Sequence, residues 1–193
     1  MAKTKRKIDY RRVARFERAL SIHFELATRT QFAEGFKWYD DARSELLAIA
    51  IQFHSTIEIA AGICAALSPK LRWSANLLYT DWVFQGLTIP HLKTPVSKAL
   101  AIRDTGNVEL ITAPKTSAFY ANLIGDLSRV TVDVWMYRAA GLSDSRVKPW
   151  HYREIELAAN RLAEKSGIDP ARVQAIIWIV VRANWKRGLI IEE

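Results

Sequence analysis

The chain has 193 residues, of which 50% are hydrophobic and 25% are charged. This composition is typical of a globular protein and excludes a disordered, collagen-like or low-complexity chain. The single cysteine, Cys64, excludes a disulfide framework, a cysteine-ligated iron–sulfur cluster and a zinc ribbon, because each needs several cysteines. The length predicts one domain, residues 1–193, folded around a single core.

The net charge of +8 is concentrated at the start of the chain. Residues 1–20 hold eight lysines and arginines against two acidic residues, a net charge of +6. We interpret residues 1–20 as a basic N-terminal arm, which favours a polyanionic partner such as DNA through contacts to phosphate. The arm residues expected to bind phosphate are Lys3, Lys5, Arg6, Lys7, Arg11 and Arg12.

Several prolines follow residues that cap helices, and they predict where helices begin. A capping residue directly precedes Pro69, Pro95 and Pro170, and Thr112 lies two positions before Pro114. Apolar residues then recur with the helical period, and only residues 108–111 alternate as a strand would. The pattern predicts an all-α, single-domain helical bundle. The expected helices cover residues 8–27, 41–66, 69–85, 95–103, 115–125, 133–140, 149–166 and 170–186.

The longest apolar stretch, residues 57–67, contains Glu58 and is shorter than the roughly 20 residues that a membrane helix requires. Polar residues follow the basic start of the chain, where a secretory signal peptide would have its apolar segment. We therefore expect a cytoplasmic protein with no membrane partner.

Lys115 and Asp133 are the first candidates for catalysis. They lie 18 residues apart, each at the start of a predicted helix, so a crossed helix pair could bring both into one cleft. Lys115-Thr116 followed by Val130-Thr-Val-Asp-Val-Trp-Met-Tyr-Arg138 resembles the catalytic core of the helix-hairpin-helix (HhH-GPD) DNA glycosylase superfamily, which contains endonuclease III and 8-oxoguanine glycosylase. The lysine-to-aspartate spacing is similar to that of the endonuclease III branch. The segment from Ala65 to Asn76 also resembles the family's Leu-Ser-x-Gln region, and together these segments cover roughly residues 55–140.

The resemblance implies an HhH-GPD fold and a DNA N-glycosylase, with or without AP lyase activity, in which Asp133 and Lys115 are catalytic. A lysine that attacks a sugar carbon must be neutral, which a desolvated cleft favours, and an aspartate beside it stabilises positive charge on the sugar. The alternative reading is structural: lysines near helix starts are usually solvated, and aspartate is a favoured N-cap.

The sequence departs from the family pattern in one segment and at one further residue. The glycines that let a hairpin approach a DNA phosphate are replaced by Ile111-Thr-Ala-Pro114, and Lys70 stands where the family has a glutamine. On the last predicted helix, Gln174, Trp178 and Arg182 share one face, which suits either a base or phosphate contact or a buried tryptophan with a polar rim. The full set of expected DNA-binding residues is Lys70, Trp73, Asn76, Arg138, Gln174, Trp178 and Arg182.

Three functions therefore stay open. The first is a DNA base-processing enzyme that acts on an extruded or modified base through Lys115 and Asp133. The second is an enzyme of the same fold in thymine hypermodification. Gln174, Trp178 and Arg182, together with Lys115-Thr-x-x-Phe-x-x-Asn-Leu123 and the Ser-Pro/Trp/Asn segment at residues 68–76, resemble small bacteriophage proteins related to the glycosylases. A phage-encoded protein would act in the bacterial host's cytoplasm. The third is a non-catalytic helical DNA-binding protein. The four histidines lack metal-ligand spacing and no phosphate-cradling glycine motif occurs, so neither a metal nor another cofactor is predicted.

Overall fold

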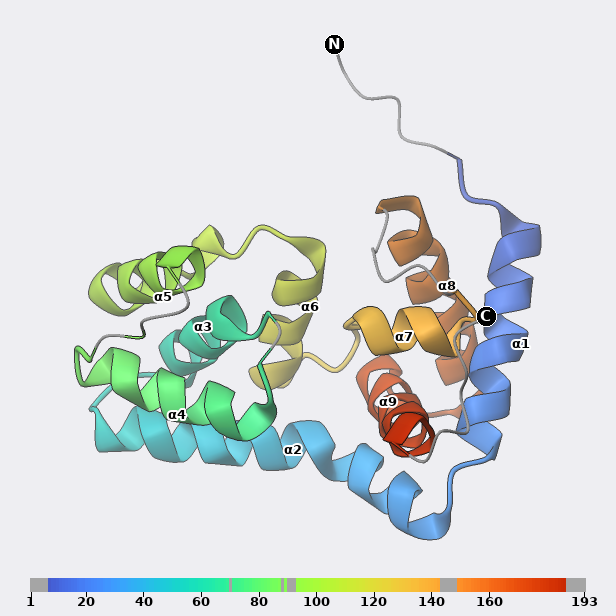
Figure 1. The fold of residues 1–193 in the computed structure, drawn as a ribbon, viewed down its shortest axis with the longest axis horizontal. Helices are drawn as coiled ribbons and strands as arrows, with labels where there is room; N and C mark the ends of the chain where they lie inside the picture. Colours follow the sequence, from blue (N-terminus) through green and yellow to red (C-terminus); the bar gives the residue numbers. More distant parts are fainter. Residues whose placement is uncertain (1–6, 70, 88, 90–92, 143–148, 187–193) are drawn as a thin grey trace. The chain divides into compact units, whose positions relative to one another are not determined.

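The computed structural model describes residues 7–69, 71–87, 89, 93–142 and 149–186, and within these ranges the chain is all-α, as predicted (Figure 1). Helices and short turns account for the regular structure, and these ranges contain no strand. The elements are α1 (Tyr10–Glu25), α2 (Arg29–Gln52), α3 (Ile57–Leu67), α4 (Trp73–Phe84), α5 (Lys93–Thr105), the 3-10 helix η1 (Val108–Leu110), α6 (Pro114–Leu123), α7 (Val134–Ala139), α8 (Pro149–Ser166) and α9 (Pro170–Lys186).

The chain forms two compact units, whereas its length predicted a single core. Unit 1 combines Met1–Trp38 with Val130–Glu193, and unit 2 is Tyr39–Arg129. The division falls inside α2, without the proline- or glycine-rich linker that marks many domain boundaries, so the sequence gives no local sign of it. Each unit has its own hydrophobic cluster.

Unit 1 is built around α1, which packs along α8 and also contacts α7 and α9. Val13, Phe16 and Leu20 recur at the helical period and are fully buried, so they form the face of α1 that meets the core. To the same core α7 contributes Met136 and Tyr137, both fully buried.

Unit 2 is organised around α3, which packs against α4, α5 and α6. Every residue from Ala60 to Leu67 is buried, which explains the longest apolar stretch in the sequence as a central core helix. In the part of the chain that the structure describes, no single helix is long and apolar enough to cross a membrane. Taken together, α2 and α3 have the length and the apolar composition of a membrane span, but the chain bends by 115° between them.

The predicted helix over residues 41–66 is wrong, because the chain turns sharply between α2 and α3. His54 adopts a positive φ of 49°, and the Ser55 N–H donates to the Ala50 carbonyl at 2.8 Å, which closes the end of α2. Thr56 then caps α3 by accepting from the Ile59 N–H. A left-handed residue other than glycine has no clear signature in the sequence, and the apolar periodicity runs on across the turn.

The predicted start at residue 41 is also wrong, because α2 begins at Arg29, and the signal for that start is in the sequence. Thr28 and Gln31 form a reciprocal cap: the Thr28 N–H donates to the Gln31 side chain at 3.0 Å, and the Gln31 N–H donates to the Thr28 hydroxyl at 3.2 Å. The proline rule holds for Pro114 and Pro170, which begin α6 and α9. It is wrong for Pro69, because α4 begins only at Trp73.

One glycine sets how closely two helices of unit 1 approach. A Cβ added to Gly35 of α2 would lie 2.5 Å from the Cα and 2.7 Å from the backbone nitrogen of Ile176 in α9. These are backbone atoms, which cannot rotate away as a flexible side chain can. Gly35 is therefore required for close packing rather than for a turn.

We expect Gly35→Ala to lower the free energy of unfolding by about 2 kcal/mol, because the steric cost exceeds the roughly 1 kcal/mol that alanine adds through helix propensity. Urea unfolding followed by circular dichroism measures the change. Glu34→Ala, at the exposed neighbouring position, is the control and should leave the midpoint almost unchanged. A Gly35→Ala variant as stable as the wild type would contradict this account of the packing.

Candidate functional site

Asp133 occupies the start of α7, as predicted, and both of its carboxylate oxygens accept hydrogen bonds. Oδ1 accepts from the backbone N–H groups of Trp135 at 2.9 Å and Met136 at 3.1 Å, which is an N-cap. Oδ2 accepts from the indole Nε1 of Trp178 at 3.3 Å. One side chain therefore begins α7 and also ties it to α9.

Beside Asp133, tryptophans and arginines of α7 and α9 alternate in a continuous series that we call the tryptophan–arginine ladder. The Arg182 guanidinium carbon lies 4.3 Å from the ring centroid of Trp178 and 5.9 Å from that of Trp135. The Arg138 guanidinium carbon lies 4.8 Å from the Trp135 centroid and 4.0 Å from the Trp185 centroid. The order is thus Trp178, Arg182, Trp135, Arg138, Trp185, and each step is a cation–π contact.

Helix periodicity explains why these five side chains meet. Trp178, Arg182 and Trp185 lie at i, i+4 and i+7 on α9, so they share one face. Trp135 and Arg138 lie at i and i+3 on α7, and the two helices pack together. All five ladder residues are half-buried. The ladder therefore runs along the junction of the two helices, with part of every member open to solvent.

The ladder includes three of the predicted DNA-binding residues, Arg138, Trp178 and Arg182, together with two tryptophans that we missed. The sequence does contain a signal for both: Trp185 follows Arg182 by three residues and Trp135 precedes Arg138 by three, and residues three apart lie on the same face of a helix. Gln174 differs from the expectation, because it is only 4% exposed and buried in α9, so it does not share the half-open surface of Trp178 and Arg182. The ring of Trp38 also packs against Trp178, with the centroids 5.9 Å apart.

The other predicted residues that the structure describes lie in unit 2. Lys115 is half-buried in the first turn of α6, and the half-buried Trp73 donates from its indole Nε1 to Glu45 at 2.6 Å. Asn76 is only 3% exposed and donates to the Cys64 sulfur at 3.1 Å, so its expected base contact is replaced by a role inside the core. Burial raises the pKa of the Cys64 thiol to about 12. Lys70 lies outside the described residues.

The pairing of Lys115 with Asp133 stays a prediction. Lys115 belongs to unit 2 and Asp133 to unit 1, and each unit is described by itself.

The predicted basic arm divides into residues with different roles. Lys7 and Arg11 are exposed, while Lys3, Lys5 and Arg6 lie outside the described residues. Arg12 instead turns toward Glu154 of α8, with its Nε 2.6 Å from Oε2 and its Nη2 3.0 Å from Oε1. Its expected contact to phosphate is therefore replaced by a structural ion pair, because a carboxylate that is only 1% exposed needs a partner.

The exposed face of α1 carries the rest of the basic charge. Arg11, Arg15 and Arg18 are all exposed and lie at i, i+4 and i+7, so they form a row along one side of the helix. We call these three residues the α1 arginine row. Arg15 and Arg18 belong to the charge of the predicted arm but are not among its predicted phosphate contacts.

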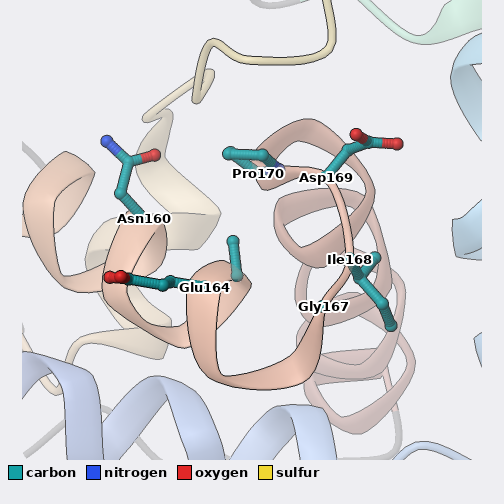
Figure 2. Close-up of a pocket in the computed structure, with 7 residues that line it drawn as sticks. Asn160, Glu164, Gly167, Ile168, Asp169 and Pro170 are labelled. Carbon is teal, nitrogen blue, oxygen red and sulfur yellow. The ribbon is translucent and has the colours of Figure 1, made fainter.

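A shallow pocket of about 350 Å³ opens between the end of α8 and the start of α9 (Figure 2). Asn160 and Glu164 project from α8, and Pro170 lies across the pocket. The Asn160 Oδ1 atom is buried, and none of the described residues forms a hydrogen bond with it. None of the predicted site residues lines this pocket. Within the described ranges, no three histidine, cysteine or acidic side chains come together as metal ligands would.

Residues 2–185 match one protein family, described as Family of unknown function (DUF7178), and this range covers nearly the whole chain. The chain belongs to the DUF7178 family. No curated protein and no solved structure matches it. For this DUF7178 member, the helix-hairpin-helix resemblance therefore stays a hypothesis that depends on the quoted motifs.

The Arg12–Glu154 pair predicts how the stability of unit 1 depends on pH. Burial acts to raise the pKa of Glu154, but hydrogen bonds from Arg12 and from the Asp9 N–H outweigh burial and hold this pKa below its ordinary value of 4.5. A lowered pKa in the folded state stabilises the protein above the unfolded pKa. That contribution is lost as the pH falls through the lowered value.

We expect Glu154→Gln to lower the free energy of unfolding at neutral pH by about 2–3 kcal/mol. Below pH 4.5 the wild type should lose stability more steeply than the variant, so the two converge. Urea unfolding at a series of pH values measures both effects. Glu164→Gln, an exposed glutamate on the same helix, is the control and should follow the wild type at every pH. A constant difference between wild type and Glu154→Gln at all pH values would contradict this role of the carboxylate.

Proposed function

We propose that this protein binds DNA through the basic surface of unit 1. The observation that carries the proposal is the α1 arginine row: Arg11, Arg15 and Arg18 are exposed on one helix face, while Arg12 between them is paired with Glu154. Consecutive turns of a helix place the Cβ atoms of these residues about 5–6 Å apart, so the three long side chains can make several contacts along a phosphate backbone. The net charge of +8 favours the same partner.

The binding should be electrostatic and largely independent of base sequence. Arginine donates to phosphate through its planar guanidinium, and each phosphate contact releases counterions from the DNA. Binding of this kind weakens as salt rises, and the slope of that dependence counts the contacts. The number of phosphates held by the α1 arginine row can therefore be measured directly.

We expect the triple variant Arg11→Gln, Arg15→Gln, Arg18→Gln to bind duplex DNA more weakly and to reduce the salt slope by about 2–3, because each contact to B-DNA contributes roughly 0.9. Fluorescence anisotropy of a labelled duplex over a range of KCl concentrations gives both quantities. The matched control replaces Arg29, Arg43 and Arg72, three exposed arginines of other segments, and removes the same charge. Equal losses in the two triple variants would mean that net charge, and not the row, decides binding.

A second candidate function is DNA base processing, either as an N-glycosylase, with or without lyase activity, or in thymine hypermodification. The arrangement of Asp133 favours it, because hydrogen bonds from α7 and Trp178 fix the carboxylate beside aromatic rings that could hold a base. A fixed carboxylate can stabilise positive charge that develops on a deoxyribose. Lys115 is the proposed nucleophile in the lyase version, which requires a neutral amine and forms a Schiff base.

Asp133→Asn should abolish base release and leave folding nearly intact, because asparagine also caps helices well. Lys115→Gln should abolish borohydride trapping on DNA while base release persists. Release of bases from duplexes with a panel of damaged and modified bases measures the first effect. The control is Asp126→Asn, an exposed aspartate that accepts from the Ser128 N–H in a local turn. Full activity in Asp133→Asn would mean that Asp133 is only a helix cap.

A further inference from the structure

We propose that the tryptophan–arginine ladder is a binding site for unpaired bases of single-stranded DNA. This inference rests on the proposed DNA binding and goes beyond it by naming the form of DNA that unit 1 prefers. It depends on the five ladder residues of α7 and α9, not on Lys115 or on any contact between the units.

The ladder offers the two kinds of contact that a single strand needs. Trp135, Trp178 and Trp185 are half-buried, so part of each indole reaches solvent and can stack on a base. Arg138 and Arg182 lie over these rings at 4.0–5.9 Å, and a guanidinium over a ring keeps N–H donors at its edge for phosphate. Stacking surfaces and cations therefore alternate, as bases and phosphates do along a strand.

Arg182 is the cation best placed for this role. Its contacts are the rings of Trp178 and Trp135, and no carboxylate of the described residues pairs with it. The Asp133 carboxylate beside the ladder accepts hydrogen bonds from two backbone N–H groups and from Trp178. A phosphate near Arg182 would therefore meet a guanidinium that no carboxylate of the described residues neutralises.

Unpaired DNA fits this surface better than duplex DNA for a steric reason. In a duplex the faces of the bases are stacked on one another, and only their edges are reachable from the grooves. Indole rings and guanidinium planes recognise faces, so they act on bases that have left the stack. Among the described residues, the only aromatic contact of the α1 arginine row is that of Arg15 with Phe16, so the row suits the phosphates of either form.

The test compares three probes on the full chain: a single-stranded oligothymidylate, an abasic oligonucleotide of equal length, and a duplex of equal length. Binding is followed by anisotropy, and quenching of tryptophan fluorescence reports on stacking. The main variant is Trp185→Ala, which removes the ring at the end of the ladder. Trp185→Phe keeps an aromatic face, and Trp150→Ala removes a half-buried tryptophan of unit 1 outside the ladder. Arg182→Gln leaves all tryptophans in place, so it still tests the ladder if Trp185→Ala fails to fold.

We expect the wild type to bind the oligothymidylate more tightly than the abasic strand and to show quenching. Trp185→Ala should weaken oligothymidylate binding by about 5- to 150-fold, the range for one lost base stack, with little effect on the abasic strand or the duplex. Trp185→Phe should recover most of the affinity, Trp150→Ala should match the wild type, and Arg182→Gln should weaken both single strands.

Two failures can be told apart. If no probe binds at low salt, the proposed DNA binding is wrong, and the ladder inference falls with it. If the duplex binds but oligothymidylate and abasic strands bind equally, or if neither Trp185→Ala nor Arg182→Gln changes oligothymidylate binding, the proposed DNA binding stands. In that case the ladder only holds α7 against α9.

Discussion

Unit 1 depends on the ion pair between Arg12 of α1 and the buried carboxylate of Glu154 in α8. The carboxylate accepts two hydrogen bonds from Arg12 and one from the Asp9 backbone N–H, so residues near the start of the chain bind a helix 142 positions later. An unpaired charge at that depth would cost several kcal/mol, and the core of unit 1 can therefore close only when α1 is in place. Because Val13, Phe16 and Leu20 face the core, helix periodicity places the arginines at positions 11, 15 and 18 on the outer face of α1, while Arg12 lies at the edge that meets Glu154.

Asp133 shows how one side chain can have both a structural and a chemical reading. Capping requires an oxygen near the first N–H groups of α7, and catalysis requires a fixed negative charge near a sugar. The same hydrogen bonds serve both needs, because an N-cap is also a carboxylate held in one place. The geometry at Asp133 thus fits either interpretation. The tryptophan–arginine ladder beside it is relevant to the catalytic one, because it supplies aromatic surfaces on which a base could stack.

Local features of the sequence predicted local structure well. Aspartate before Val134 and proline at positions 114 and 170 act within one helical turn, so α6, α7 and α9 begin where expected. The turn at His54 was not predictable, because its backbone conformation has no side-chain signature. The cap formed by Thr28 and Gln31, in contrast, can be recognised in the sequence, because threonine followed three residues later by glutamine is a capping-box pattern.

Long-range features were predictable only in part. Helix periodicity predicts that Gln174, Trp178 and Arg182 share one face of α9. It does not predict that Gln174 is buried while the other two are half-exposed, because burial depends on which helices pack against each turn of α9. The family resemblance predicts a DNA contact for Asn76, yet the core of unit 2 encloses it beside Cys64. The division into two units depends on contacts between segments that are distant in the sequence, and local sequence patterns carry no information about such contacts.

The order of the segments has a consequence for synthesis on the ribosome. Unit 2 is one continuous stretch, Tyr39–Arg129, whereas unit 1 needs segments from both sides of it. Unit 2 can therefore complete its core while α7, α8 and α9 have not yet been made. During that interval Val13, Phe16 and Leu20 of α1 have no partners from the later helices. The nascent chain must keep this apolar face from aggregating until α8 emerges, which makes the first helix the vulnerable part of the molecule during its own production.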